Sequence, residues 1–284
     1  MALDLDPARA LLERADALVA GAAARLADLG GPDAAQSFAY DLAHVASALA
    51  TARAGVDYGA RGEVESALAR AFCGLALADA AAAILGREAL WGVASDWFEP
   101  FASVVAEARD PGGLAALAET PGPRHLGEVF EMVASTFHRF AEERVRPYAE
   151  EVHRRNADIP ESVIEGLAEL GAFGLSVPER YGGFSAGGEG EYVAMVVATE
   201  ELSWGSLGVG GSLITRPEIL ARALMAGGTE EQRALWLPKV ATGEVLPAIA
   251  VTEPDFGSDV AGITTVAKRV EGGWRITGTK TWCT

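Results

Sequence analysis

A short segment around residue 255 combines residue types suited to binding a polar ring or an amide. It reads AVTEPDFGSD over Ala250–Asp259, so an apolar run ends in a hydroxyl, a carboxylate and a Pro/Gly turn. Pro254 and Gly257 favour a turn with exposed backbone N–H groups. With the Ser258 hydroxyl, such a turn can donate hydrogen bonds to the carbonyl oxygens of a polar ligand. An ordinary strand-ending turn at Thr252–Pro254 is the alternative interpretation.

A second segment, Gly278–Thr284, reads GTKTWCT and places Trp282 among hydroxyl-bearing residues. A tryptophan in this setting is as readily a core aromatic as part of a binding site. Taken alone, each of the two segments leaves a structural and a functional interpretation open.

These two segments lie in a C-terminal region, residues 245–284, that has β character. Residues 246–251, 263–269 and 273–277 suit strands, and Gly272–Gly273 predicts a hairpin turn between the last two. About forty residues of this kind are too few for a sheet with its own core. We therefore expect the beginning of a β-barrel-like domain that is incomplete within this chain.

The preceding region, residues 121–244, has helical periodicity. Apolar residues follow the i, i+3, i+4 pattern between Phe130 and Phe140. Asp158 is predicted to cap the next helix, and Thr229 is predicted to cap a later one. This region predicts a helical domain that precedes the two segments.

The first region, residues 1–120, is Ala-rich and almost free of strand signals. Apolar positions such as Leu42, Val45 and Leu49 recur at helical spacing, and Gly30–Pro32 separates two helices. The pattern predicts an antiparallel helical bundle in which alanine permits close helix packing. The fold class predicted for the whole chain is therefore mainly α.

The charge and the cysteines restrict the classes of function. The 284 residues include 40 acidic and 23 basic side chains, and the resulting net charge of −17 would repel a nucleic-acid backbone. Cys73 and Cys283 lie far apart and predict neither a disulfide framework nor a zinc site. The acidic N-terminal stretch does not fit a secretory signal, and the apolar stretch 72–85 is short for a membrane span. We expect a cytoplasmic protein without a metal site.

Five ordered segments resemble motifs of the acyl-CoA dehydrogenase family. The two segments described above are similar to the two signatures of that family, and three more matches lie upstream. Together they cover roughly residues 125–284. The five matching segments are Val177–Gly183, Glu200–Leu202, Glu231–Lys239, Ala250–Asp259 and Gly278–Thr284.

This resemblance implies an enzyme that uses FAD to oxidise an acyl-CoA thioester between Cα and Cβ. It implies cofactor contacts at six positions and a contact of Ser258 with the acyl-CoA as well. It also implies an electron-transfer flavoprotein as electron acceptor and a homo-oligomer. The implied cofactor-binding residues are Val251, Thr252, Gly257, Ser258, Trp282 and Thr284.

The family also uses a carboxylate, usually Glu, to remove the α-proton while hydride leaves Cβ for the flavin. No Glu of this sequence can be assigned that role by motif, so no catalytic residue is predicted. We therefore expect the chain alone to be inactive. The alternative is a non-catalytic helical binding or assembly subunit derived from the family.

One segment bears on the substrate. Some members of the family act on a branched thioester with a free carboxylate. The segment Gly211–Leu220 and the long Ala-rich N-terminal extension resemble the corresponding parts of those members. Arg216 is a candidate to bind such a carboxylate bidentately. The alternative is a surface ion pair of Arg216 with Glu218 or another nearby acid.

Overall fold

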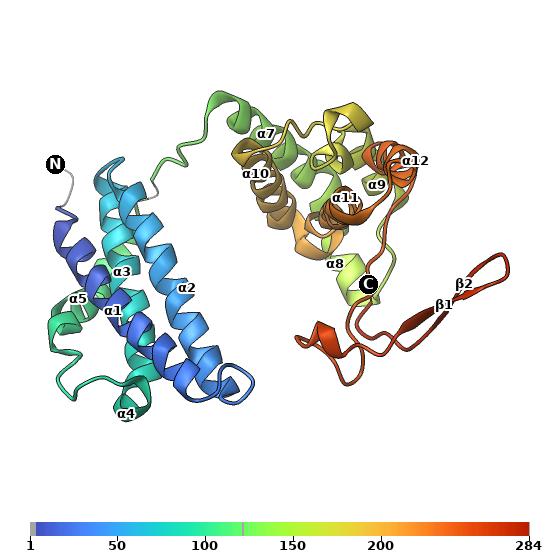
Figure 1. Ribbon diagram of the computed structural model, residues 1–284. Helices are drawn as coiled ribbons and strands as arrows, with labels where there is room; N and C mark the ends of the chain where they lie inside the picture. The colour runs from blue at the N-terminus through green and yellow to red at the C-terminus, as the bar shows by residue number, and fades with distance from the viewer. Residues whose placement is uncertain (1–3, 121, 284) are drawn as a thin grey trace. The chain divides into compact units, whose positions relative to one another are not determined.

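The computed structural model describes residues 4–120 and 122–283, and the chain divides into two compact units, Met1–Arg124 and His125–Thr284 (Figure 1). Helices dominate both units, and a single two-stranded sheet lies near the C-terminus of the described residues. This confirms the mainly α prediction, with a helical extension, a second helical domain and the start of a β region.

The first unit is a bundle of long helices joined by short connections (Figure 1). Its core combines small side chains, such as the fully buried Ala52 and Cys73, with large aromatic ones such as Trp91. A Cβ added at Gly74 would lie 2.3 Å from the Ala108 Cβ, so α3 and α5 approach too closely for a larger residue. The elements are α1 (Asp6–Asp28), α2 (Gln36–Gly59), α3 (Glu63–Ile84), α4 (Glu88–Trp91), η1 (Glu99–Phe101), α5 (Ala102–Ala108) and α6 (Pro111–Ala118).

Helix α3 is longer than its apolar stretch indicated, because it begins at Glu63. By length and composition alone it could cross a membrane. In the bundle it packs mainly against α2 and α5 and buries Cys73 and Leu77. Burial raises the pKa of the Cys73 thiol to about 11, and Cys73 and the exposed Cys283 are both free. Many of the apolar side chains of α3 are therefore used in packing against the neighbouring helices.

The second unit begins with a long helix that contains one π-helical turn. Helix α10 packs along it and ends in another π-helical turn. The core between them holds Phe137, Val145, Leu167, Phe173 and Leu202. The elements are α7 (Glu128–Phe140), η2 (Ala141–Val145), α8 (Arg146–Arg155), α9 (Glu161–Glu169), η3 (Ala172–Gly174), η4 (Glu179–Tyr181), α10 (Glu189–Ser206), η5 (Leu207–Gly211), α11 (Thr215–Gly227) and α12 (Glu230–Ala241).

The two predicted helix caps have different outcomes. Thr229 accepts a hydrogen bond from the Gln232 N–H at 3.3 Å, and the Gln232 side chain accepts one from the Thr229 N–H at 2.9 Å. This capping box confirms the prediction. The prediction for Asp158 is wrong, since Pro160, in an extended conformation, occupies the N-cap position of α9. Asp158 lies two residues too early to cap that helix.

The C-terminal region contains an antiparallel hairpin of β1 (Val266–Val270) and β2 (Gly273–Thr277). The predicted hairpin is confirmed, but its turn residues are Glu271 and Gly272 and not Gly272 and Gly273, because Gly273 already pairs with Val270. Gly272 has a φ of 80°. Residues 246–251 form no strand, contrary to prediction. An apolar sequence becomes a strand only where a partner supplies the ladder hydrogen bonds, and the described residues provide no such partner there.

Candidate functional site

The first of the two segments folds into the predicted turn. The Glu253 N–H donates to the Phe256 carbonyl at 3.0 Å, and the Phe256 N–H donates back to the Glu253 carbonyl at 3.2 Å. A Cβ built at Gly257 would meet no atom within 4 Å, so the backbone there lies open. Val251 and Ser258 are exposed and Thr252 is half-buried. The turn therefore leaves backbone and hydroxyl groups available to a ligand.

The second segment lies directly beside the first. The Thr281 N–H donates to the Thr252 carbonyl at 2.9 Å. Lys280 Nζ donates to the Val251 carbonyl at 2.7 Å. Gly278 lies against Thr265, where a Cβ would be only 2.1 Å from the Thr265 hydroxyl, so a larger residue does not fit there. The structure thus brings Val251 and Thr252 next to the residues that precede Trp282.

A buried carboxylate, that of Glu253, lies at the junction of the two segments. It accepts hydrogen bonds from the Thr264 N–H and hydroxyl, both at 2.6 Å, and from the Thr265 N–H at 2.8 Å. Lys280 Nζ lies 3.0 Å from it. These hydrogen bonds, the one from the Thr264 hydroxyl first, hold the pKa of Glu253 well below its ordinary value of 4.5.

Neither Glu253 nor Lys280 was predicted to have a role, although both lie within the two signature segments. A pairing across 27 residues cannot be read from a local pattern. The only sequence signal was a Glu and a Lys next to the two hydroxyl residues Thr252 and Thr281. Such a combination is common in solvated turns, so it does not by itself indicate a buried ion pair.

Trp282 is presented to solvent. Its side chain is 90 % exposed, so it is not a core aromatic in this structure. Its backbone has a φ of 59°, a left-handed conformation that costs a bulky residue about 1–3 kcal/mol. Strain of this kind persists where the surrounding contacts or a function require it. Thr284, the last predicted cofactor contact, lies outside the described residues.

The arrangement fits a flavin in three respects. Trp282 offers an uncovered ring, and Gly257 offers open backbone. Thr252 carries its hydroxyl at the joint between the two segments. Among the described residues, Thr281 Oγ1 is also buried without a hydrogen-bond partner, which is uncommon and marks a place where a further polar group can bind. The contacts of individual residues with a flavin stay predictions.

Arg216, the candidate for a substrate carboxylate, lies in the first turn of α11, just after the π-helical turn η5. It is half-buried. Glu218, one of its suggested partners, accepts a hydrogen bond from Arg222 at 2.9 Å. The π-helical turn is itself notable, because such turns are frequent at functional sites. A role for Arg216 in substrate binding stays a prediction.

The helical part of the second unit also contains an apolar cavity of about 550 Å³. It lies between the N-terminal halves of α7 and α10 and the loop at Phe184. Val129, Met132 and Phe184 are each 63 % exposed at its rim. Arg216 is not among its lining residues, which include Phe130, Val133, Phe137, Leu170, Leu175, Ala186 and Ala194.

Another group that sequence analysis missed is a polar and aromatic cluster on α7 and α10. His138 Nδ1 lies 2.8 Å from the buried carboxylate of Glu201. The His138 ring packs against Trp204 with centroids 4.4 Å apart, and the Arg146 guanidinium lies 4.9 Å from the Trp204 ring centroid. Glu201 is buried and Trp204 is 48 % exposed, so the cluster extends from the core to the surface where α10 contacts α7 and α8. It is separate in sequence from the flavin segments.

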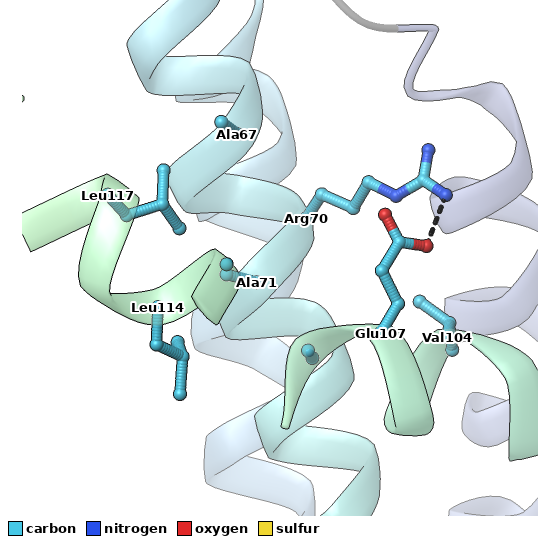
Figure 2. A pocket seen from close by; sticks show the side chains of 9 residues that line it. Ala67, Arg70, Ala71, Val104, Glu107, Leu114 and Leu117 are labelled. Carbon is cyan, nitrogen blue, oxygen red and sulfur yellow. Dashed lines mark hydrogen bonds and ion pairs between the residues drawn. The ribbon is translucent and has the colours of Figure 1, made fainter. Parts of the chain in front are cut away.

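The first unit has a smaller cavity of about 190 Å³ between α3, α5 and α6 (Figure 2). Figure 2 shows Arg70 of α3 extending toward Glu107 of α5, and the two side chains form an ion pair of 2.7 Å. Leu114 and Leu117 of α6 line the same cavity. The guanidinium and the carboxylate at this cavity are thus paired with each other, while Arg70 Nε is buried without a hydrogen-bond partner among the described residues.

Comparison with known proteins matches residues 128–244 to the family model of the acyl-CoA dehydrogenase N-terminal domain. The chain is 46 % identical over 183 residues to (2S)-methylsuccinyl-CoA dehydrogenase of Cereibacter sphaeroides, covering 64 % of this chain and 32 % of that protein. It is 38 % identical over 148 residues to mitochondrial isovaleryl-CoA dehydrogenase of Solanum tuberosum, covering 51 % and 35 %. The chain thus spans about a third of the length of these curated relatives.

Among solved structures, the chain is similar to one described as the electron transferring flavoprotein of Acidaminococcus fermentans. The sequence identity is 28 % and the TM-score is 0.50. The similarity covers 56 % of this chain and 40 % of that chain.

Proposed function

We propose that this chain, whose residues 128–244 are an acyl-CoA dehydrogenase N-terminal domain, belongs to an FAD-dependent enzyme that oxidises an acyl-CoA thioester between Cα and Cβ. The observation that carries the proposal is the hydrogen bond from the Thr281 N–H to the Thr252 carbonyl, which joins the two family signatures at one place. Similarity to acyl-CoA dehydrogenases and to a flavoprotein supports it.

The chain's own residues would bind and orient the cofactor. The Thr252 hydroxyl and the backbone near Gly257 would hydrogen-bond to the polar edge of the ring system, and Trp282 would cover a ring face. Ser258 would lie where it reaches both a flavin phosphate and the acyl-CoA. Val251 and Thr284 complete the proposed cofactor set. The bound FAD would accept the hydride that leaves Cβ.

The proton acceptor is not assigned within this chain. Glu253 is excluded on geometric grounds, because its carboxylate is buried and already accepts four hydrogen bonds from protein groups. Since no other Glu matches the family's base by motif, we propose that the 284 residues alone do not turn over substrate. The active enzyme would supply a carboxylate to remove the α-proton.

For the substrate, we propose (2S)-methylsuccinyl-CoA, which would be converted to mesaconyl-CoA. The 46 % identity to a methylsuccinyl-CoA dehydrogenase supports this choice. A substrate with a free carboxylate needs a cation in its pocket, since an unpaired buried carboxylate is costly. Arg216 is the proposed cation. We further propose a homo-oligomer and an electron-transfer flavoprotein as electron acceptor on the basis of the family resemblance. We also propose a cytoplasmic location, because the two free cysteines fit a reducing compartment.

Titration of the purified chain with FAD tests the flavin part of the proposal. Saturable binding of one FAD per chain is expected. On addition of methylsuccinyl-CoA, the flavin absorbance should be lost only when the catalytic carboxylate is also present, since a general base commonly accelerates such a step by roughly 10²–10⁴-fold. Bleaching by methylsuccinyl-CoA with the chain alone would contradict the proposed inactivity. Absence of any FAD binding would favour the non-catalytic helical subunit.

A further inference from the structure

Glu253 and Lys280 form a buried ion pair in a part of the chain that is otherwise exposed. Their side chains are 2 % and 20 % exposed, whereas every residue of β1 and β2 is exposed. Removing charges from water is unfavourable unless each charge is paired and hydrogen-bonded. The surrounding contacts must therefore satisfy this pair in full.

The carboxylate of Glu253 has donors on both oxygens. Oε2 accepts from the Thr264 N–H and hydroxyl, each at 2.6 Å. Oε1 accepts from the Thr265 N–H at 2.8 Å and from Lys280 Nζ at 3.0 Å. With four donors in place, the carboxylate is occupied by protein groups and is not free to bind substrate. Its role must act through the residues it holds.

Lys280 extends the connection to the first signature. Its Nζ also donates to the Val251 carbonyl at 2.7 Å. The next residue, Thr281, donates its N–H to the Thr252 carbonyl at 2.9 Å. The ion pair therefore links three stretches of chain that are distant in sequence, namely 251–253, 264–265 and 280–281.

These contacts lie beside the proposed cofactor residues without including their ring or hydroxyl groups. Lys280 donates a hydrogen bond to the backbone of Val251, and Trp282 lies two residues after Lys280. Trp282 keeps its ring in solvent and its backbone at a φ of 59°, so its direction depends on how residues 280 and 281 are anchored.

We propose that Glu253 and Lys280 are positioning residues that fix Val251 and Thr252 relative to Trp282, so that the flavin site is assembled before FAD binds. This inference rests on the proposed function of the two signatures. It assigns neither residue a contact with the flavin. Its physical basis is pre-organisation, since a site already held together spends less binding energy on ordering the chain.

The test uses the full chain with Lys280→Met, compared with Lys268→Met as a matched control. Lys268 lies on exposed β1, so the control removes the same charge without touching the ion pair. Amide hydrogen exchange of Thr281, Thr264 and Thr265 is measured without FAD. FAD affinity is then measured by flavin fluorescence.

For Lys280→Met we expect exchange at the Thr281 amide to become at least about tenfold faster and FAD to bind about tenfold or more weakly, the usual scale for lost charge-assisted hydrogen bonds. Lys280→Arg should restore most of both, because it returns a charged donor. Lys268→Met should change neither. Helical circular dichroism should be the same in all variants, which separates the effect from general unfolding.

Faster exchange in Lys280→Met with unchanged FAD affinity would overturn the positioning role. Unchanged exchange would overturn the connection itself. Equal losses of exchange protection and FAD affinity in Lys268→Met would show a general effect of charge and would overturn the positioning role as well. If the unmodified chain binds no FAD, the proposed function fails and the positioning role fails with it, while the exchange data still decide whether the ion pair joins the two segments.

Discussion

The helical part of the second unit is built around a buried apolar core, whereas the region after residue 245 leaves most of its large apolar side chains exposed. Val145, Leu167 and Phe173 are 0 % exposed, but Trp274 is 65 % exposed. In the region after residue 245, the side chain of Glu253 is buried and accepts hydrogen bonds from Thr264, Thr265 and Lys280. Apolar burial therefore stabilises the helices, and a network of hydrogen bonds around one carboxylate holds the signature segments.

This difference also separates the proposed roles. Arg216, proposed for the acyl group, lies on a helix of the packed region, and Thr252, proposed for the flavin, lies in the polar network. Changes to apolar packing should therefore affect global stability, and changes to the polar network should affect cofactor binding.

The largest effect is expected for Phe173→Ala in the helical core. Removing a fully buried aromatic ring should destabilise the second unit by about 3–5 kcal/mol. Urea unfolding followed by helical circular dichroism measures this loss. Phe184→Ala, with a side chain that is 63 % exposed, is the control and should cost much less. Equal losses would mean that the helical region does not depend on apolar burial as described.

Arg216→Met tests the separation of roles. In the active enzyme that contains this chain, it should lower kcat/KM for methylsuccinyl-CoA by about 2–4 kcal/mol, the scale for breaking a buried charge pair. A neutral thioester such as 2-methylbutanoyl-CoA should react as before or faster, and FAD affinity should not change. If both substrates are affected equally, Arg216 has a structural role only.

A smaller effect is expected at the capping box of α12. Thr229→Ala removes the acceptor for the Gln232 N–H and should cost about 1 kcal/mol of helix stability. Thermal unfolding measures this change. Thr229→Ser keeps the hydroxyl and should be nearly neutral. Loss of FAD binding in Thr229→Ala would show that the helical and signature regions are more strongly coupled than their contacts indicate.

The effect of pH should appear in the signature segments with little change in the helices. The folded pKa of Glu253 lies below its ordinary value of 4.5, so its stabilising contribution is complete above that pH. It is lost as the pH falls below about 4.5 through the folded pKa. Amide chemical shifts of Thr264 and Thr281 should report this loss, and Glu253→Gln should remove the pH dependence. A titration centred near neutral pH would contradict the assignment.

The sequence predicted the two regions unequally. Helical periodicity around Phe130–Phe140 and the Thr229 capping box are local, so they could be read from neighbouring residues. The hairpin turn at Gly272 is local as well. Residues 246–251 were wrongly predicted as a strand, because strand formation depends on a distant partner that local β propensity does not reveal.

The candidate site was predicted in outline. The motifs identified Val251, Thr252, Gly257, Ser258 and Trp282, and the structure places residues of the two segments side by side. The buried pair that connects them was not predicted. It depends on three distant stretches of chain meeting at one carboxylate, and no periodicity or spacing encodes such a meeting.

The central claim is that the two signature segments together form a flavin site, and an FAD titration of the chain and of Thr252→Val tests it most directly. The unmodified chain should bind FAD saturably. Thr252→Val keeps the shape of the side chain but removes its hydroxyl, so affinity should fall by roughly 1.5–3 kcal/mol, with Lys268→Met unchanged. Absence of saturable binding, or equal affinity in Thr252→Val, would contradict the claim.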